Sequence, residues 1–270
     1  MVVQHNMKAV NTNRMLGQNV KAVSKSAEKL SSGYKVNRAA DDAAGLSISE
    51  KMRNQVRGLN QAVKNSEDGI SLIQTAEGNM NEIHSILQRM GELAVKSRND
   101  VNATEDRATI QDEVAQLKEE ITSITNKAEF NGTKLLSGGL QGKMLQVGAN
   151  VGETMSVSIS GTSLTTLGVN TTSVGTAAAA SAAISQIQTA IKSVSSQRSK
   201  LGAIQNRLEY TINNLENYSE NLTSAESNIR DTDMATEMVG YSKNNILQQA
   251  AQSMLAQANQ SNQGVLSLLQ

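Results

Sequence analysis

Residues 244–270, NNILQQAAQSMLAQANQSNQGVLSLLQ, decide the fold, because this stretch has no charged side chain and still has a regular pattern. Mostly apolar side chains recur in it at alternating spacings of four and three residues, which places them on one stripe of an α-helix. No apolar run approaches the ~20 residues that a bilayer requires. We therefore predict a helix that is buried among other helices and does not insert into a membrane. The stripe consists of Leu247, Ala251, Met254, Ala258, Ser261, Val265 and Leu268, and the line beside it of Ile246, Ala250, Leu255, Leu266 and Leu269.

The N-terminus has a similar pattern. Two terminal helices that pair only with each other bury one face each, and neighbouring copies of the chain can cover the remaining faces. We hypothesise that both ends are mobile in the monomer and become ordered on self-assembly. Spacings of three and four residues, with one turn skipped, connect Val3, Met7, Val10, Leu16, Val20, Val23, Ala27 and Leu30.

The composition excludes several kinds of chemistry. The 270 residues include no Cys, which excludes disulfides, thiolate nucleophiles and zinc–sulfur sites. Pro is also absent, so nothing has to interrupt a long helix. Apolar residues make up 38 % of the chain and aromatic residues 2 %, which favours the thin cores of long bundles. The formal net charge is zero, so self-repulsion does not oppose association, and we expect no nucleic-acid partner.

Basic residues are concentrated near the N-terminus. Residues 1–40 carry seven Lys or Arg against the single acidic residue Glu28. A basic, amphipathic N-terminus also occurs in mitochondrial presequences, but here the periodicity continues without a break of the kind that a cleavage site makes. Met1–Lys8 has no basic region followed by an apolar one, so we predict no secretory signal peptide.

Four segments have the periodicity of helices. Residues 4–32 form the first, which ends near Gly33, and residues 44–98 and 105–128 form the next two. Residues 177–229 have the strongest pattern, because every seventh residue from 187 to 229 is apolar, and a half-polar companion row indicates that the partners of this helix change along its length. Within 44–98, four glycines indicate close helix approach or flexibility: Gly58, Gly69, Gly78 and Gly91.

Residues 129–176 lack this periodicity. The sequence EFNGT at 129–133 is a turn signal, and alternating side chains at 145–147 and 155–159 flank a second turn. The pattern predicts one small β-hairpin. Residues 161–175 are rich in Ser, Thr and Gly and are predicted to be a loop.

Two polar joints separate the terminal helices from the long ones. Asp41 and Asp42 precede the second helix, and Asp231 and Asp233 precede the charge-free C-terminal helix. We predict that these carboxylates cap helix N-termini. A metal site or an acid–base pair at Asp41 and Asp42 is the alternative, which is disfavoured because no His or third acidic residue lies nearby.

Together these patterns predict a mostly α protein, a long antiparallel helical bundle or coiled coil with one small β-hairpin region. Residues 1–42 and 231–270 are expected to form a domain of terminal helices. Residues 43–230 are expected to form a helical rod domain, with the hairpin and loop at 129–176.

No catalytic or metal-binding pattern is present. His5 and His84 belong to no HExxH or GxSxG sequence, so we expect neither an enzyme nor a cofactor. Besides a self-assembling filament protein, two classes remain open. A coiled-coil module of a secretion or adhesin system shares heptads but does not need a charge-free helix, and a receptor hairpin requires a transmembrane span that is missing.

The chain resembles bacterial flagellin, the filament subunit of the flagellum, over roughly residues 1–150 and 177–270. The most specific motifs are LSSGYKVNRAADDAAGLSISEKMR at 30–53, IRDTDMATEM at 229–238 and ILQQAAQSMLAQANQSNQGVLSLLQ at 246–270. FNGTKLL at 130–136 and LQVGANVGETMSVSI at 145–159 match as well.

The resemblance implies a structural subunit that self-assembles into a helical tube for motility. It implies secretion through the flagellar export apparatus with an export chaperone, and assembly under a cap protein. The long helices and hairpin are implied to form an outer tube, and only residues 160–176 occupy the place of the variable outer domains, which are absent. Leu255→Asp is expected to block polymerisation. The terminal helices are implied to line an inner tube that packs through Leu16, Val20, Val23, Leu247, Met254, Leu255, Val265 and Leu268.

Flagellins are also ligands of the vertebrate Toll-like receptor for flagellin. The resemblance places this contact on a QRxxELAV motif, here residues 88–95, and on the next helix. Gly91 departs from the motif, because a side chain is more usual there, and is expected to loosen the helix. Arg89, Glu92 and Leu93 are expected to share one helix face. The implied receptor-binding residues are Gln88, Arg89, Glu92, Leu93 and Glu113.

Overall fold

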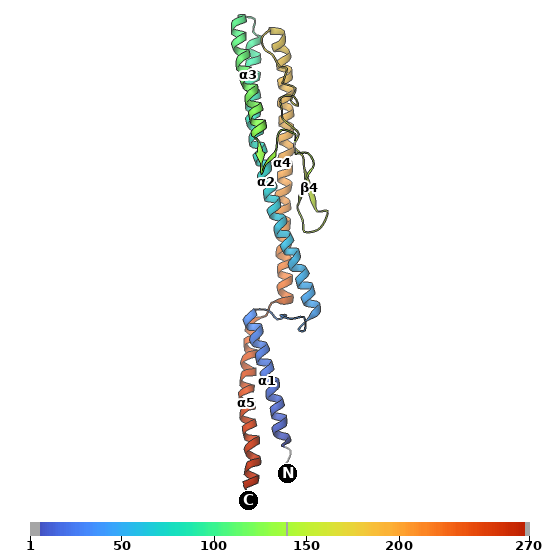
Figure 1. The fold of residues 1–270 in the computed structure, drawn as a ribbon, viewed down its shortest axis with the longest axis vertical. Coiled ribbons are helices and arrows are strands. Elements are labelled where there is room, and N and C mark those ends of the chain that lie inside the picture. Colours follow the sequence, from blue (N-terminus) through green and yellow to red (C-terminus); the bar gives the residue numbers. More distant parts are fainter. Residues whose placement is uncertain (1–5, 139, 268–270) are drawn as a thin grey trace. The chain divides into compact units, whose positions relative to one another are not determined.

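The computed structural model describes residues 6–138 and 140–267, with side-chain environments up to residue 261 (Figure 1). Helices account for most of these residues, so the mostly α class is confirmed. The helices are α1 (Met7–Ser32), α2 (Ala43–Arg98), α3 (Thr104–Lys127), α4 (Ala177–Arg230) and α5 (Met234–Ser267). The strands are β1 (Glu129–Phe130), β2 (Thr133–Lys134), β3 (Lys143–Gln146) and β4 (Thr154–Val157).

Capping groups set the bounds of α1. The Asn6 side chain accepts a hydrogen bond of 3.1 Å from the Ala9 N–H at the start of the helix. At its end, Gly33 adopts φ 76°, a left-handed conformation that glycine reaches without a steric cost. The predicted end of this helix is confirmed, and its predicted start at residue 4 lies outside the described residues.

The chain divides into two compact units. Unit 1 consists of Met1–Asn54 and Asn221–Gln270, and unit 2 of Gln55–Glu220. Unit 1 therefore contains α1, α5 and the adjoining ends of α2 and α4. Within it, α1 and α5 run side by side (Figure 1).

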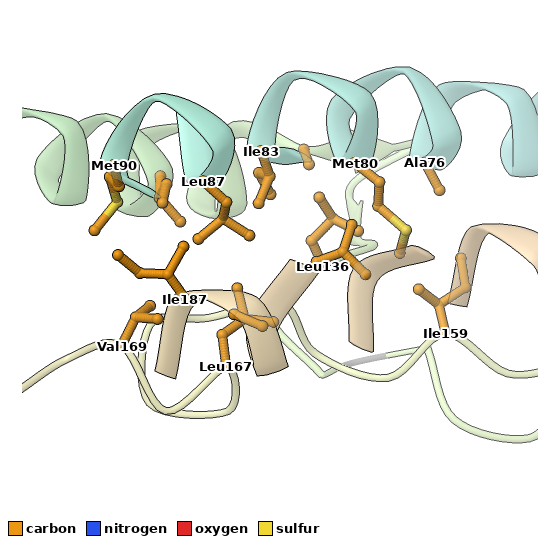
Figure 2. Close-up of a cluster of buried hydrophobic side chains, with 14 of the residues drawn as sticks. Ala76, Met80, Ile83, Leu87, Met90, Leu136, Ile159, Leu167, Val169 and Ile187 are labelled. Carbon is orange, nitrogen blue, oxygen red and sulfur yellow. The ribbon is translucent and has the colours of Figure 1, made fainter. Parts of the chain in front are cut away.

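The heptad rows of α2 and α4 form the core of unit 2. Leu87 of α2 and Ile187 of α4 are fully buried and face each other across the cluster drawn in Figure 2. From α3, Val114 and Ile121 join the same core. The predicted row of α4 is buried from Ile187 to Leu215, whereas its last two members, Leu222 and Ile229, are half-buried and belong to unit 1.

The segment 160–176 contributes to this core more than its composition predicts. Leu167, Val169 and Val174 are buried, and Figure 2 shows Leu167 and Val169 beside Ile187. The burial of these three side chains could not be predicted from the sequence, because they follow no regular period and stand among Ser, Thr and Gly residues. The predicted loop is therefore a packed layer of the core.

Two side chains of α3 hold that segment in place. Lys118 Nζ donates hydrogen bonds to the carbonyl oxygens of Asn170, at 3.1 Å, and Thr172. Gln111 Oε1 accepts the Val174 N–H at 2.6 Å. These bonds satisfy backbone groups that no regular element pairs.

Two short antiparallel hairpins follow α3. Asn131 and Gly132 join β1 to β2 with φ of 47° and 74°, the positive values that a two-residue Asn-Gly turn requires. The sequence predicted this turn but not the strands beside it. The second hairpin pairs Leu145 of β3 with Met155 of β4, which confirms the predicted hairpin with slightly different bounds.

Two glycines of α2 let the second hairpin approach the helix closely. A Cβ at Gly58 would lie 2.9 Å from the Ala149 Cβ, and one at Gly69 would lie 2.5 Å from a methyl carbon of Leu145. A Cβ at Gly78 would meet no atom within 4 Å, so close approach explains only part of the glycine pattern.

Gly78→Ala is expected to raise the free energy of unfolding of unit 2 by about 0.5–1 kcal/mol, because the added methyl group meets open space and Ala has less conformational entropy to lose. Gly58→Ala is the matched comparison. It is expected not to raise the free energy of unfolding, because its methyl group would push against Ala149 and displace the hairpin. Urea denaturation measures both changes. Equal stabilisation by the two substitutions would contradict close packing of the hairpin on α2.

Candidate functional site

The terminal helices half-bury some apolar side chains against each other and leave other apolar side chains exposed. Leu16 and Val23 of α1 and Leu255 of α5 are half-buried. The Asn6 side-chain amide donates a hydrogen bond of 3.0 Å to the carbonyl of Ala258, which places that side of α5 against α1. Val20, Leu247 and Met254 are exposed, the side chain of Val265 is not described, and Leu268 lies outside the described residues.

The exposed apolar residues of α1 and α5 define what we call the terminal-helix surface. The C-terminal half of this surface is unusual, because Ile246 is 66 % exposed and Met254 is 61 % exposed on a helix segment without charge. So many exposed large apolar residues on two adjacent helices favour a protein-binding role for these helices. The surface consists of Met7, Val10, Met15 and Val20 on α1 and Met234, Met238, Val239, Ile246, Leu247 and Met254 on α5.

In the N-terminal joint, the two predicted carboxylates have different partners. Asp42 Oδ1 accepts the Gly45 N–H at 2.9 Å, at the start of α2. Asp41 instead lies 2.8 Å from Lys25 Nζ and also accepts the backbone N–H groups of Arg38 and Asn37. The Lys25 ammonium, followed by these N–H groups, holds the pKa of Asp41 below its ordinary value.

The C-terminal joint pairs with the N-terminal one. Tyr34 and Asp231 form an antiparallel β-bridge, so Asp231 takes part through its backbone. The Arg230 guanidinium stacks 4.5 Å from the centre of the Tyr34 ring. The roles of Lys25, Tyr34 and Arg230 could not be predicted from the sequence, because no local pattern shows which distant residues meet.

Asp233 lies at the N-terminus of α5. Its Oδ1 accepts the N–H groups of Ala235 and Thr236 at 3.0 and 3.3 Å, and its Oδ2 accepts the Thr236 hydroxyl at 2.8 Å. The hydroxyl bond and then the backbone bonds lower the pKa of Asp233.

Asp41→Asn is expected to lower the melting temperature of unit 1 at pH ~6 but not at pH ~2. A carboxyl with a depressed pKa stabilises the fold above its unfolded pKa, about 3.9, and loses that contribution as the pH falls through its folded pKa. At low pH, neutral Asp and Asn are nearly equivalent. Circular dichroism melts of both proteins check this, and an equal difference at both pH values would contradict the ion pair.

On unit 2, three of the residues implied in receptor binding form one charged cluster. Arg89 of α2 lies 2.8 Å from Glu113 Oε1 of α3 through one terminal guanidinium nitrogen and donates a second bond of 3.0 Å to it through Nε. Its other terminal nitrogen lies 3.1 Å from Glu92 Oε2. Glu113, and secondarily Glu92, raise the pKa of Arg89. The cluster is solvent-exposed and links α2 to α3.

The remaining implied residues divide between surface and core. Gln88 is exposed beside the cluster. Leu93 is only 2 % exposed and belongs to the core of unit 2, so the expectation that it shares the exposed face of Arg89 and Glu92 is wrong. Gly91 remains helical, and a Cβ there would lie an ordinary 3.7 Å from an Ile187 methyl carbon.

Neither a metal site nor a membrane span is found in the described chain. Among residues 6–138 and 140–267, no three or more His, Asp or Glu side chains gather as metal ligands would. In the same ranges, no helix combines the length and the apolar character that crossing a bilayer requires.

Two flagellins are similar to this chain along its whole length. Flagellin of Halalkalibacterium halodurans is 53 % identical over 271 residues, and flagellin of Bacillus subtilis is 49 % identical over 305 residues. Each alignment covers 100 % of both proteins. Among solved structures, Bacillus cereus flagellin matches with a TM-score of 0.52 at 29 % identity, over 56 % of this chain and 88 % of that one.

Two family models divide the chain between them. The model described as the bacterial flagellin N-terminal helical region matches residues 3–140, and the model of the C-terminal helical region matches residues 184–269. The chain therefore belongs to the bacterial flagellin family and is a structural protein of the flagellum rather than an enzyme.

Proposed function

We propose that the chain is the repeating subunit of a bacterial flagellar filament and that the terminal-helix surface is its main assembly contact. The observation that carries this proposal is the exposure of large apolar side chains, such as Ile246, on a charge-free helix. Burying each of them between subunits stabilises a polymer by up to about 1.5–3 kcal/mol. The family to which the chain belongs supports the same role.

The exposed apolar residues favour an open polymer over a closed dimer. Val239 and Ile246 lie one heptad apart on one line of α5, and Leu247 and Met254 lie one heptad apart on the next. Further exposed residues of α1 extend the surface, so one partner helix cannot cover all of it. In a helical filament, each subunit uses different faces to contact several neighbours, so such a polymer can cover the whole surface.

In the filament, the two parts of the chain take different positions. Residues 1–42 and 231–270 form the inner domain, with α1 and α5 lining the tube, and residues 43–230 form the outer domain. Residues 160–176 stand in place of the variable outer domains. Three apolar residues of that segment pack into the core of unit 2, so this core needs no additional domain to cover it.

Export precedes assembly in this proposal. The chain is secreted unfolded with an export chaperone, and subunits assemble under a cap protein at the filament tip. The absence of Cys and Pro supports this route, since no disulfide has to be broken and no slow prolyl isomerisation delays folding.

Amide hydrogen exchange tests the assembly role directly. In the monomer, α1 and α5 are expected to exchange rapidly, because one face of each helix lacks a partner. In the polymer, both helices are expected to be strongly protected. Equal protection of α5 in the two states would contradict the proposed contact.

A second proposed role is binding to the vertebrate Toll-like receptor for flagellin. The cluster of Arg89, Glu92 and Glu113, with Gln88 beside it, supports this role because it is exposed, charged and held by three hydrogen bonds from the Arg89 guanidinium, two to Glu113 Oε1 and one to Glu92. Leu93 supports the helix from within the core and is not part of the contact.

Arg89→Ala is expected to weaken binding to the receptor ectodomain by about tenfold or more, because it removes a preorganised donor and releases two acidic side chains. Arg57→Ala, at another exposed arginine of α2, is the control and is expected to bind normally. Surface plasmon resonance measures both, with circular dichroism to verify helix content. Unchanged affinity of Arg89→Ala would exclude the cluster from the contact.

A further inference from the structure

Exposed methionine side chains are concentrated on the terminal helices. Five of the eleven methionines lie exposed on α1 and α5. In unit 2, Met80, Met90 and Met155 are at most 7 % exposed, and Met144 is the exception at 74 %. The exposed fractions on the terminal helices are 71 % for Met7, 45 % for Met15, 47 % for Met234, 50 % for Met238 and 61 % for Met254.

Exposed methionine thioethers are the most readily oxidised side chains in the chain. The sequence contains neither Cys nor Trp, so a two-electron oxidant meets no thiol or indole. With a peroxide, the methionine sulfur gains one oxygen atom and loses two electrons, while the O–O bond breaks and the peroxide is reduced to water or an alcohol. The product is a polar sulfoxide in place of an apolar thioether.

The effect of this oxidation on assembly depends on whether the sulfur faces water or lies between subunits. In the free subunit, the sulfoxides on α1 and α5 face water, which satisfies their hydrogen-bonding capacity. Between subunits, the same oxygen would be buried in an apolar contact without a donor, which opposes association.

We propose that Met7, Met15, Met234, Met238 and Met254 form an oxidation site that controls assembly. Oxidised free subunits stay folded but do not polymerise, and polymerised subunits are protected because neighbouring copies cover the thioethers. The inference rests on the proposed role of the terminal-helix surface, and it adds a reversible chemical control of that surface.

The test treats the purified full-length monomer with hydrogen peroxide, locates sulfoxides by peptide mass spectrometry and measures polymerisation by sedimentation. The critical concentration is expected to rise about tenfold or more, with unchanged circular dichroism. Methionine sulfoxide reductases for both sulfoxide epimers are expected to restore polymerisation. In preformed filaments, the five sulfurs are expected to oxidise more slowly than in the monomer.

Leucine substitutions identify which sulfurs matter. A variant with Met234→Leu, Met238→Leu and Met254→Leu keeps apolar side chains and is expected to lose most of the peroxide sensitivity. Met144→Leu, at the exposed methionine of unit 2, is the control and is expected to remain sensitive.

The outcomes separate this inference from the proposed function. Normal polymerisation of a wild-type chain that carries sulfoxides at all five positions would overturn the inference and leave the assembly role intact. Failure of untreated wild-type chain to polymerise would overturn the assembly role itself.

Discussion

Ile246→Asp is expected to abolish polymerisation while leaving the subunit folded. Ile246 is 66 % exposed in the subunit, so a carboxylate there is hydrated and costs the monomer little. In the polymer the same carboxylate would lose its water in an apolar contact between subunits. Burying a charge in this way costs several kcal/mol, even with Lys243 one turn away on the same helix, which raises the critical concentration by about a hundredfold or more.

Two controls accompany this substitution. Ile246→Leu keeps the apolar contact and is expected to polymerise. Val101→Asp adds the same charge at an 87 % exposed position in the turn between α2 and α3 and is expected to polymerise as well. Sedimentation of all three variants decides the question, and abundant filaments of Ile246→Asp would exclude α5 from the assembly contact.

Leu255→Asp is a less specific test than the sequence alone indicated. Leu255 is half-buried on a helix that packs on α1, so a carboxylate there also disturbs the subunit. A loss of polymerisation by that variant would not distinguish a broken subunit from a blocked contact.

Leu87→Ala is expected to lower the free energy of unfolding of unit 2 by about 2–5 kcal/mol. Leu87 is fully buried in the core of unit 2. Truncation to Ala leaves a cavity, and the closely packed side chains around it can relax only in part to fill it. Val95→Ala removes apolar carbon from the same helix at a 60 % exposed position and is expected to change stability little. Urea denaturation followed by circular dichroism measures both, and similar shifts would contradict the assignment of the core.

The helices could be predicted from the sequence because their signals are periodic. Seven-residue spacing located the buried row of α4 from Ile187 to Leu215, and Gly33 marked the end of α1. The core residues of the 160–176 segment could not be predicted, because Leu167, Val169 and Val174 follow no period and are selected by the shape of the space between helices.

The candidate site could be predicted only in part, because contacts between distant segments leave no periodic signal in the sequence. Composition identified α5 as a helix that needs partners, but not which side of it α1 covers. The motif around Arg89 located the charged cluster, whereas the burial of Leu93 depends on how α2 rotates against its neighbours. The joints pair through Tyr34 and Asp231, which are far apart in the chain, and no local pattern encodes such a contact.

Negative-stain electron microscopy tests the central claim most directly. Purified full-length chain and a chain that ends at Val239 are compared after salt-induced assembly. We predict long, uniform filaments from the full-length chain and none from the shortened one, because the latter lacks most of α5. Filaments from both chains, or only small discrete oligomers from the full-length chain, would contradict the assignment of the terminal helices as the driving contact.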